Sequence, residues 1–391
     1  MKYDFDTQIN RRGSYSLKWD VPEGELPMWV ADMDFCTAPE IQEAICKRAE
    51  HGIYGYTVVP DEWYQAYRGW WENMHHFQIE KEWLLFCTGV IPAISVAVKN
   101  LTEPGDKVLI QTPVYNGFFH AVTDQGRKIA ENPLRYDSGR YEMDFPLLEQ
   151  QLSDPGTTMM VLCNPHNPVG IIWDRETLRQ VGELCKKHHV IVLSDEIHCD
   201  LTAPGLGYIP FASVSDTCRE ISITAVAPTK SFNLAGIKTA AVFVPDRANY
   251  QKMKKGLWAD GIGEPNVFAV DAAVAAYSKG SLWLEGLRQY LQGNKQYVVE
   301  FLENELPQIT VVSAEATYLL WLDCRSLSVS SRKLAAFLRK EAKLYLMDGT
   351  VYGSNGDGFL RINIACPKEF VKEGMKRFKN GVKEYANRKN I

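Results

Sequence analysis

The sequence lacks several features that would assign it to common classes of protein. Its 391 residues carry 43 Lys and Arg against 48 Asp and Glu, so no excess of positive charge attracts it to nucleic acid or to an anionic membrane. No apolar run approaches the roughly 18 residues that a membrane-spanning helix needs. Internal repeats and low-complexity tracts are also missing. We therefore expect an ordinary globular protein without nucleic-acid or membrane partners.

Cysteine usage and the first residues favour a cytoplasmic location. The nine cysteines are scattered and form no Cys-x-x-Cys, so neither a disulfide framework nor a zinc site is expected. The N-terminal residues MKYDFDTQINRRG are too polar for a secretory signal. We expect a protein of the reducing cytoplasm.

Signatures of several enzyme classes are missing as well. The chain has no Gly-x-Ser-x-Gly and no Walker A pattern. The glycine-rich segment 353–358 precedes a predicted strand, whereas a dinucleotide-binding loop joins a strand to a helix. The histidine pairs at 75–76 and 188–189 are adjacent, so they do not present two imidazoles on one helical face, and we interpret them as surface residues.

What the sequence does contain is a long α/β pattern. Short apolar runs alternate with helical patterns from about residue 84 to 245, which is typical of a mostly parallel sheet. After a helical region at about 264–304, the remaining chain predicts a mixed α+β part. We divide the chain into a large domain, 41–284, and a small domain, 1–40 with 285–391. The strands predicted for the large domain are 84–87, 107–111, 159–163, 190–194, 220–226 and 239–244, and those for the small domain lie in 317–324 and 358–366, on either side of a helix at 330–342.

Several polar side chains follow these predicted strands, where open parallel sheets bind their ligands. Lys230 stands in the loop after 220–226, and a lysine with a lowered pKa at such a place can form a Schiff base; the alternative is a solvated loop lysine. Asp195 closes its strand and would pair with a pyridinium nitrogen or cap a helix. Asn167, in NPHNPVG, would donate to a cofactor oxygen or belong to an ordinary turn.

Three further positions complete the predicted site. Thr88 and Gly89 lead into a helix predicted to begin near Val90, where free backbone N–H groups favour a phosphate. Tyr115 follows a strand and would stack on a planar cofactor, or else pack in the core. Arg361 shares a strand face with Phe359 and Asn363 and suits capture of a substrate carboxylate, with a surface ion pair as the alternative.

The order of these motifs resembles the fold-type I enzymes that depend on pyridoxal 5′-phosphate (PLP), over nearly the whole chain. Within them, four segments look like the MalY/PatB class of cystathionine β-lyases. The resemblance implies the aspartate-aminotransferase fold, with a mostly parallel seven-stranded sheet and a smaller α+β domain. The four segments are PMWVADMDF (27–35), GIYGYT (52–57), SDEIHCD (194–200) and APTKSFNLAGIK (227–238).

The resemblance also implies roles for particular residues. The enzyme would be a homodimer with shared active sites, in which Tyr56, rather than its neighbour Tyr54, reaches the cofactor phosphate of the partner subunit. His198 stands where aminotransferases usually carry a tyrosine, and Lys238 stands where relatives often carry an arginine for the phosphate. Because position 227 is alanine, Thr229 is the preferred phosphate hydroxyl. The residues expected to bind the cofactor are Gly89, Val90, Ile91, Tyr115, Asn167, Asp195, His198, Thr229, Lys230, Lys238 and Tyr56, of which Lys230, Asp195 and Tyr56 are also catalytic.

The expected reaction is an α,β-elimination on an amino acid that carries sulfur at Cβ, such as L-cystathionine. Lys230 would remove the Cα proton, and Arg361 would hold the carboxylate. Asn167 and Tyr115 are further residues expected to bind the substrate. Trp29 would line the pocket for the sulfur substituent, or pack as an ordinary aromatic residue. An aminotransferase is the nearest alternative, and a regulatory protein-binding role is a more distant one.

Overall fold

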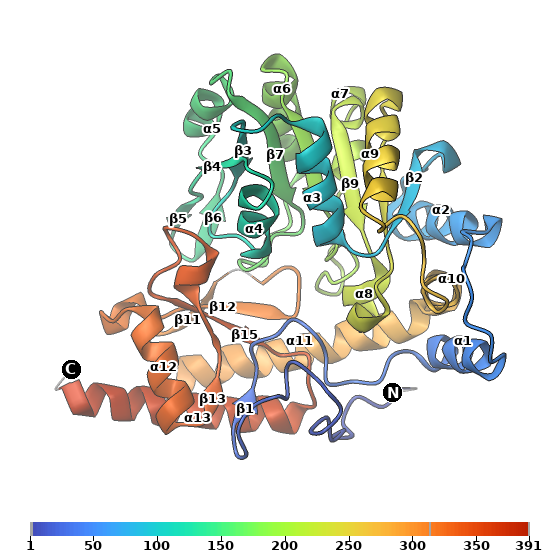
Figure 1. Cartoon of the computed structure of the whole chain (residues 1–391). Helices are drawn as coiled ribbons and strands as arrows, with labels where there is room; N and C mark the ends of the chain where they lie inside the picture. Colours follow the sequence, from blue (N-terminus) through green and yellow to red (C-terminus); the bar gives the residue numbers. More distant parts are fainter. Residues whose placement is uncertain (1–2, 313, 390–391) are drawn as a thin grey trace.

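The computed structural model describes residues 3–312 and 314–389, and its upper part in Figure 1 is built on one seven-stranded sheet. In spatial order its strands are β2 (Leu84–Cys87), β10 (Ala240–Phe243), β9 (Ser222–Val226), β8 (Ile191–Asp195), β7 (Thr157–Cys163), β3 (Lys107–Ile110) and β4 (Lys128–Glu131). Strand β10 runs antiparallel to both neighbours, and the other pairs are parallel. The predicted sheet is confirmed.

Six of these strands correspond to the apolar runs identified in the sequence, and β4 is the one that was missed. It lies at the sheet edge beside β3, and its sequence KIAE leaves every side chain partly or fully exposed. An edge strand of this kind needs no continuous apolar run, so the sequence carries little signal for it.

Helices bury both faces of the sheet, as the two-sided apolar strands predict (Figure 1). Along β7, Met159 and Val161 pack on one face while Met160 and Leu162 pack on the other. The first face is covered by α3 (Val90–Leu101), α4 (Gly117–Thr123) and α9 (Arg247–Ala259), and the second by α5 (Phe145–Leu152), α6 (Arg175–Lys187) and α7 (Asp216–Glu220).

A second, antiparallel sheet of four strands lies in the lower part of Figure 1 beside the long helix α11 (Ser281–Glu305). Leu360 and Ile362 pack in the core that contains helix residues of this region, whereas Arg361 points the other way, as predicted from the strand pattern. The helical region predicted at 264–304 in fact begins at residue 269. The strands of this sheet are β11 (Thr310–Val312), β12 (Leu319–Asp323), β15 (Phe359–Asn363) and β14 (Met347–Asp348). Further helices are α1 (Pro39–Glu50), α2 (Asp61–His75), α8 (Pro228–Ser231), α10 (Ala269–Lys279), α12 (Ser331–Glu341) and α13 (Lys368–Lys389).

The N-terminal segment 28–35 lies between the two sheets and is fastened to both parts by asparagine side chains. Asn363 donates its amide to the backbone oxygens of Val30 and Asp32, at 2.5 and 2.7 Å. Asn233 accepts from the N–H of Met33 at 2.9 Å and donates back to the oxygen of the same residue. These bonds fix the backbone of a segment that has little regular structure of its own.

Two pairs of short strands complete the fold: β1 (Leu26–Pro27) beside β13 (Leu344–Tyr345), and the hairpin of β5 (Arg135–Asp137) and β6 (Arg140–Glu142). In the described part of the chain, no helix combines the length and the apolar character that crossing a membrane requires. The division into 41–284 and 1–40 with 285–391 stays a proposal, and residues 1–2, 313 and 390–391 lie outside the described residues.

Candidate active site

A cavity of about 820 Å³ lies at the carboxyl ends of the parallel strands. Because those ends meet at one edge of the sheet, residues far apart in the sequence come together there. Of the predicted site residues, the cavity lining includes Trp29, Gly89, Val90, Ile91, Tyr115, Asn167, Asp195, His198, Thr229, Lys230, Lys238 and Arg361. Tyr56 is the predicted residue that it lacks.

Lys230 is held inside this cavity rather than in solvent. It lies on the four-residue helix α8 (Pro228–Ser231), just beyond β9, and its Nζ donates to the backbone oxygen of Ala31 at 2.6 Å. Burial, and after it the positive charge of Arg361, lowers the pKa of Lys230 to about 8. The solvated-loop alternative is therefore wrong for this lysine, and a substantial share of its amine is neutral near pH 8.

Asp195 closes β8 and is buried, 5% exposed. The N–H of Ile197 donates to its Oδ1 at 3.1 Å, and no helix begins at this point, so the helix-cap alternative is wrong. Burial raises the pKa of Asp195 to about 7, against which the Ile197 hydrogen bond and the charge of Lys230 act only partly. A cation in contact with a buried carboxylate of this kind stabilises its charged form.

The raised pKa of Asp195 predicts a measurable effect on stability. Its carboxyl binds a proton in the folded state between about pH 4 and 7 and the unfolded chain does not, so stability falls as the pH rises through this window. Asp195→Asn is therefore expected to stabilise the ligand-free protein at pH 8 by roughly 1–3 kcal/mol. The gain should shrink at pH 5, as measured by urea unfolding at both values.

Glu196 offers a matched control for this measurement. Burial also raises the pKa of Glu196 to about 7, but its carboxylate accepts hydrogen bonds from Ser194, Tyr208 and the N–H of Phe211. Glu196→Gln is expected to bring no gain in stability at pH 8, because the amide nitrogen would replace the carboxylate oxygen that accepts the hydrogen bond of the Tyr208 hydroxyl. Equal gains in stability for both variants would contradict the view that the charged carboxylate of Asp195 is unusually unfavourable in the ligand-free protein.

Arg361 is buried, 4% exposed, and points into the cavity from β15. Its guanidinium donates to the side-chain oxygen of Asn167 at 3.1 Å and to the backbone oxygen of Trp29 at 2.9 Å. Its Nε has no partner among the described residues. Neither of its two partners is a carboxylate, so the surface ion-pair alternative is wrong and its charge stays available for an anion.

Burial, followed by the positive charges of Lys230 and Arg361, lowers the pKa of His198 to about 3, so its ring is neutral. Its Nδ1 has no partner in the described part of the chain. The ring lies edge-on to Tyr318 at 6.2 Å, and the Tyr318 hydroxyl donates to the same Ala31 oxygen that Lys230 contacts. His198 thus offers an unpaired neutral nitrogen among buried groups.

The other end of the cavity is suited to a phosphate. Helix α3 begins directly after Gly89, and the first N–H groups of a helix have no acceptor within it. Gly89, Val90 and Ile91 line the cavity there, together with the Thr229 hydroxyl and the exposed Lys238. Free N–H groups, a hydroxyl and an ammonium group favour a dianion.

Two aromatic residues border the space between these ends. Tyr115 is partly buried on the cavity wall, and its backbone N–H donates to the oxygen of Asn167 at 3.1 Å. Trp29 also lines the cavity and stacks on Tyr345 with ring centroids 4.7 Å apart. Each is therefore both a packed aromatic residue and part of the cavity wall.

Tyr56 lies outside the cavity in a single chain and is fully exposed. Its neighbour Tyr54 is also exposed, and its hydroxyl donates to the oxygen of Ala49 at 2.8 Å. The side chains of Ile53 and Val58 in the same stretch are exposed too. The role expected for Tyr56 depends on a second chain and stays a prediction.

The sequence did not predict the residues that contribute to the site through a backbone oxygen, or that contact such an oxygen without lining the cavity. Ala31 contributes a carbonyl, which no sequence motif reveals, and Tyr318 acts on that carbonyl. The segment between α9 and α10, whose residues from 264 onward were predicted to be helical, instead supplies Glu264 and Asn266 to the cavity wall. Among apolar residues, Leu17, Val30 and Met347 line the cavity as well.

Comparison with known proteins agrees with this geometry. Residues 32–378 match the model of the class I and II aminotransferase family. The chain is 44% identical to cystathionine beta-lyase PatB of Bacillus subtilis (strain 168), with 96% of this chain and 99% of the relative covered. It is 32% identical to protein MalY of Escherichia coli (strain K12), with 97% and 99% covered.

Solved structures give the same picture. Cystalysin from Treponema denticola, which contains a pyridoxal 5′-phosphate cofactor, has a TM-score of 0.95 at 32% identity, with 98% of this chain and 100% of that chain covered. A PLP-bound C-S lyase from Staphylococcus hominis has a TM-score of 0.92 at 32% identity, with 97% and 98% covered. The fold of this chain is thus shared with PLP-bound enzymes along nearly its whole length.

Proposed function

Because the chain belongs to the class I and II aminotransferase family and within it to the group of PatB and MalY, we propose that it is a PLP-dependent carbon–sulfur lyase. The reaction is an α,β-elimination on a sulfur amino acid, which gives pyruvate, ammonia and a thiol. The observation that carries this proposal is Lys230, an amine with a lowered pKa that faces a buried carboxylate, a buried guanidinium and a helix start in one cavity.

The donor set of the cavity fits PLP. The N–H groups of Gly89, Val90 and Ile91, with Thr229 and Lys238, would hold its phosphate, and Tyr115 would lie against its ring. Asp195 would face the ring nitrogen, where its raised pKa favours sharing a proton, and Asn167 and His198 would bind the phenolic oxygen. The position of His198 on the cavity wall and its neutral ring support this assignment.

When bound, PLP supplies an electron sink that makes the Cα proton of an attached amino acid acidic. Arg361 binds the substrate carboxylate and so orients the Cα–H bond toward Lys230. The Lys230 amine, with its pKa of about 8, takes that proton. The electron pair of the Cα–H bond forms the Cα–Cβ double bond, the Cβ–S bond breaks, and the sulfur leaves as a thiolate. The released enamine hydrolyses to pyruvate and ammonia.

The test is to mix the purified protein with PLP and L-cystathionine and to follow the visible spectrum together with pyruvate and free thiol. Both products without an added oxo acid support the lyase. A cofactor band with products only in the presence of an oxo acid would indicate an aminotransferase instead. Absence of any cofactor band would overturn the PLP assignment.

We also propose that the enzyme is a homodimer whose active sites are shared. Exposed apolar side chains at Ile53, Tyr54, Tyr56 and Val58 support this, because such a group is unfavourable in water and suits an interface. Tyr56 would then enter the cavity of the second subunit and contact the phosphate.

The cytoplasm is the proposed location, supported by nine unpaired cysteines.

A mixed-dimer experiment tests the shared site. Lys230→Ala and Tyr56→Ala are each expected to be inactive or nearly so as homodimers. Subunits of the two variants, unfolded and refolded together, should recover about a quarter of the wild-type activity, because half of the dimers are mixed and each mixed dimer holds one intact site. Co-refolding with Tyr54→Ala in place of Tyr56→Ala is the control that distinguishes the two tyrosines. No recovery in either mixture would contradict a site shared through these residues.

A further inference from the structure

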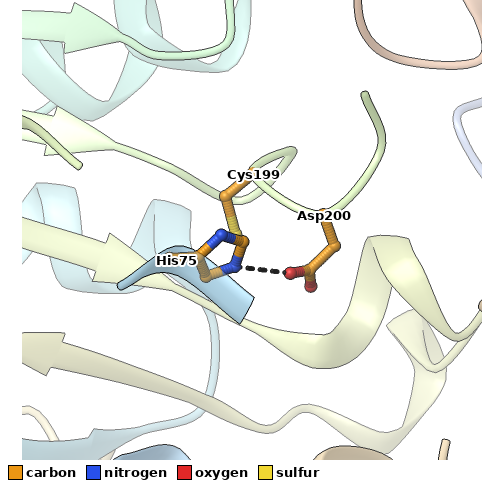
Figure 2. A group of neighbouring side chains, drawn as sticks. All are labelled: His75, Cys199 and Asp200. Carbon is orange, nitrogen blue, oxygen red and sulfur yellow. Dashed lines mark hydrogen bonds and ion pairs between the residues drawn. The ribbon is translucent and has the colours of Figure 1, made fainter. Parts of the chain in front are cut away.

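A second group of polar side chains is centred on the buried carboxylate of Asp200, which lies beside His75 and Cys199 (Figure 2). Its Oδ1 accepts from the ring Nε2 of His75 at 2.8 Å and from the indole N–H of Trp70 at 2.9 Å. Its Oδ2 accepts from the hydroxyl of Ser231 at 2.7 Å. His75 is therefore mostly buried and paired, so its interpretation as a surface residue is wrong.

The ligand-type atoms of His75, Cys199 and Asp200 lie within 4.8 Å of one another, yet the group is better explained by hydrogen bonding than by a metal ion. Both oxygens of Asp200 already accept from protein donors. Burial, and after it the negative charge of Asp200, raises the pKa of the Cys199 thiol well above its usual range. With no metal ion bound, the thiol is therefore neutral.

Asp200 is charged in this position. Burial acts to raise its pKa, but the hydrogen bond and charge of His75 and the hydrogen bonds of Ser231 and Trp70 outweigh burial, so the pKa of Asp200 lies below its usual value. A buried carboxylate with three donors is a strong and directional anchor.

This anchor joins two segments that line the cavity. Asp200 ends the stretch that begins with Asp195 and includes His198, and Ser231 directly follows Lys230 on α8. A helix of four residues has almost no stability of its own, so contacts with the rest of the chain must fix its orientation. The Ser231–Asp200 bond is one of those contacts, and it lies on the residue next to the reactive amine.

We propose that Asp200 is a positioning residue that, through Ser231, holds α8 so that the Lys230 amine stays buried in the cavity. The inference rests on the proposed role of Lys230. Loss of the Ser231 hydroxyl would let α8 move and bring the Lys230 amine nearer to water. Such a displacement lowers the rate of proton removal more than it weakens substrate binding.

Ser231→Ala tests this, with Ser331→Ala as the matched control. Ser331 is also fully buried, and its hydroxyl donates to Asp348 at 2.8 Å and to Asp357 at 3.0 Å, at the start of α12 outside the cavity. Both substitutions remove a buried serine–aspartate bond and should lower the melting temperature by similar amounts. Only Ser231→Ala is expected to change the chemistry of Lys230.

The first readout is the pH dependence of acetylation at Lys230 in the full-length, cofactor-free protein, measured by trace labelling with acetic anhydride and peptide mass spectrometry. The wild-type midpoint should lie at about 8. In Ser231→Ala it should rise by about one unit toward the ordinary lysine value, because the amine regains water. In the PLP-loaded enzyme, kcat should fall about tenfold with KM changed less than about twofold.

An unchanged midpoint with kcat within about twofold of Ser331→Ala would overturn the proposal and leave Asp200 a purely structural residue. If Ser231→Ala does not fold, Trp70→Phe answers the same question. It removes the indole N–H that donates to Asp200 and keeps an aromatic ring at this position of α2. Trp70 also contacts Phe232 at the end of α8, with ring centroids 5.9 Å apart, and phenylalanine keeps an aromatic ring for that contact. A smaller rise of the midpoint is therefore expected in Trp70→Phe, and no rise would overturn the proposal. A wild-type midpoint near that of ordinary lysines would instead count against the proposed function of Lys230.

Discussion

Lys230→Ala is expected to lower the rate of pyruvate and thiol formation from L-cystathionine by at least about 10³-fold while the protein stays folded. The substitution removes the amine that takes the Cα proton, and the other lysine that lines the cavity, Lys238, is exposed. Because burial already disfavours the charged amine, its loss should not lower the melting temperature. Product formation and thermal unfolding measured on the same preparation check both statements.

Lys238 provides the matched control, since it is the other lysine on the cavity wall. It is exposed, so Lys238→Ala is expected to weaken cofactor binding severalfold and to leave kcat nearly unchanged once PLP is saturating. If Lys230→Ala retained more than about 1% of wild-type turnover, the assignment of the base would be wrong.

Arg361→Ala is expected to lower kcat/KM for L-cystathionine by about 10²–10³-fold, which corresponds to roughly 3–4 kcal/mol. The guanidinium is buried, and its neighbours Asn167 and Trp29 do not neutralise it, so a substrate carboxylate would be its main counter-charge. Most of the effect should fall on KM, because the carboxylate is bound before as well as during the reaction. Steady-state kinetics over a wide substrate range separate the two constants.

Two comparisons make this experiment specific. A substrate-like amine without the carboxylate should inhibit the wild type and Arg361→Ala with similar strength, since it cannot use the guanidinium. Arg325 lies with its guanidinium over the ring of Phe359, 5.2 Å from the centroid, and does not line the cavity. Arg325→Ala should therefore change kcat/KM less than about threefold. A similar loss of kcat/KM in both arginine variants would indicate that the four-stranded sheet as a whole is disturbed.

The strand-end residues of the site were predictable because a parallel sheet gathers them by its geometry. Asp195, Asn167 and Lys230 each follow an apolar run, and the carboxyl ends of those runs meet at one edge. Arg361 was predictable for a different reason, since alternation along its strand separates it from Leu360 and Ile362. In both cases a short-range pattern was sufficient.

The missed parts of the site depend on contacts that leave no local pattern. Ala31 acts through its backbone oxygen, so its side chain says nothing about the role. His75 was interpreted as a surface residue because it stands next to His76, but α2 packs where Asp200 can accept a hydrogen bond from its ring nitrogen. The edge strand β4 lacks an apolar run because its side chains are partly or fully exposed, whereas those of β2 at the other edge are buried. The partner expected for Tyr56 lies on another chain, which one sequence cannot place.

The N-terminal segment has a consequence for how the protein is made. The bond from Arg361 to the oxygen of Trp29 joins residues 332 positions apart, and Asn363 reaches Val30 across 333 positions. A ribosome adds Trp29 and Val30 to the chain 332 and 333 residues before it adds their partners Arg361 and Asn363. The nascent chain therefore carries an unpaired first segment through most of its synthesis, and non-local contacts of this kind form late in folding. Cofactor capture should follow release of the finished chain, so a polypeptide that stops before β15 would bind none.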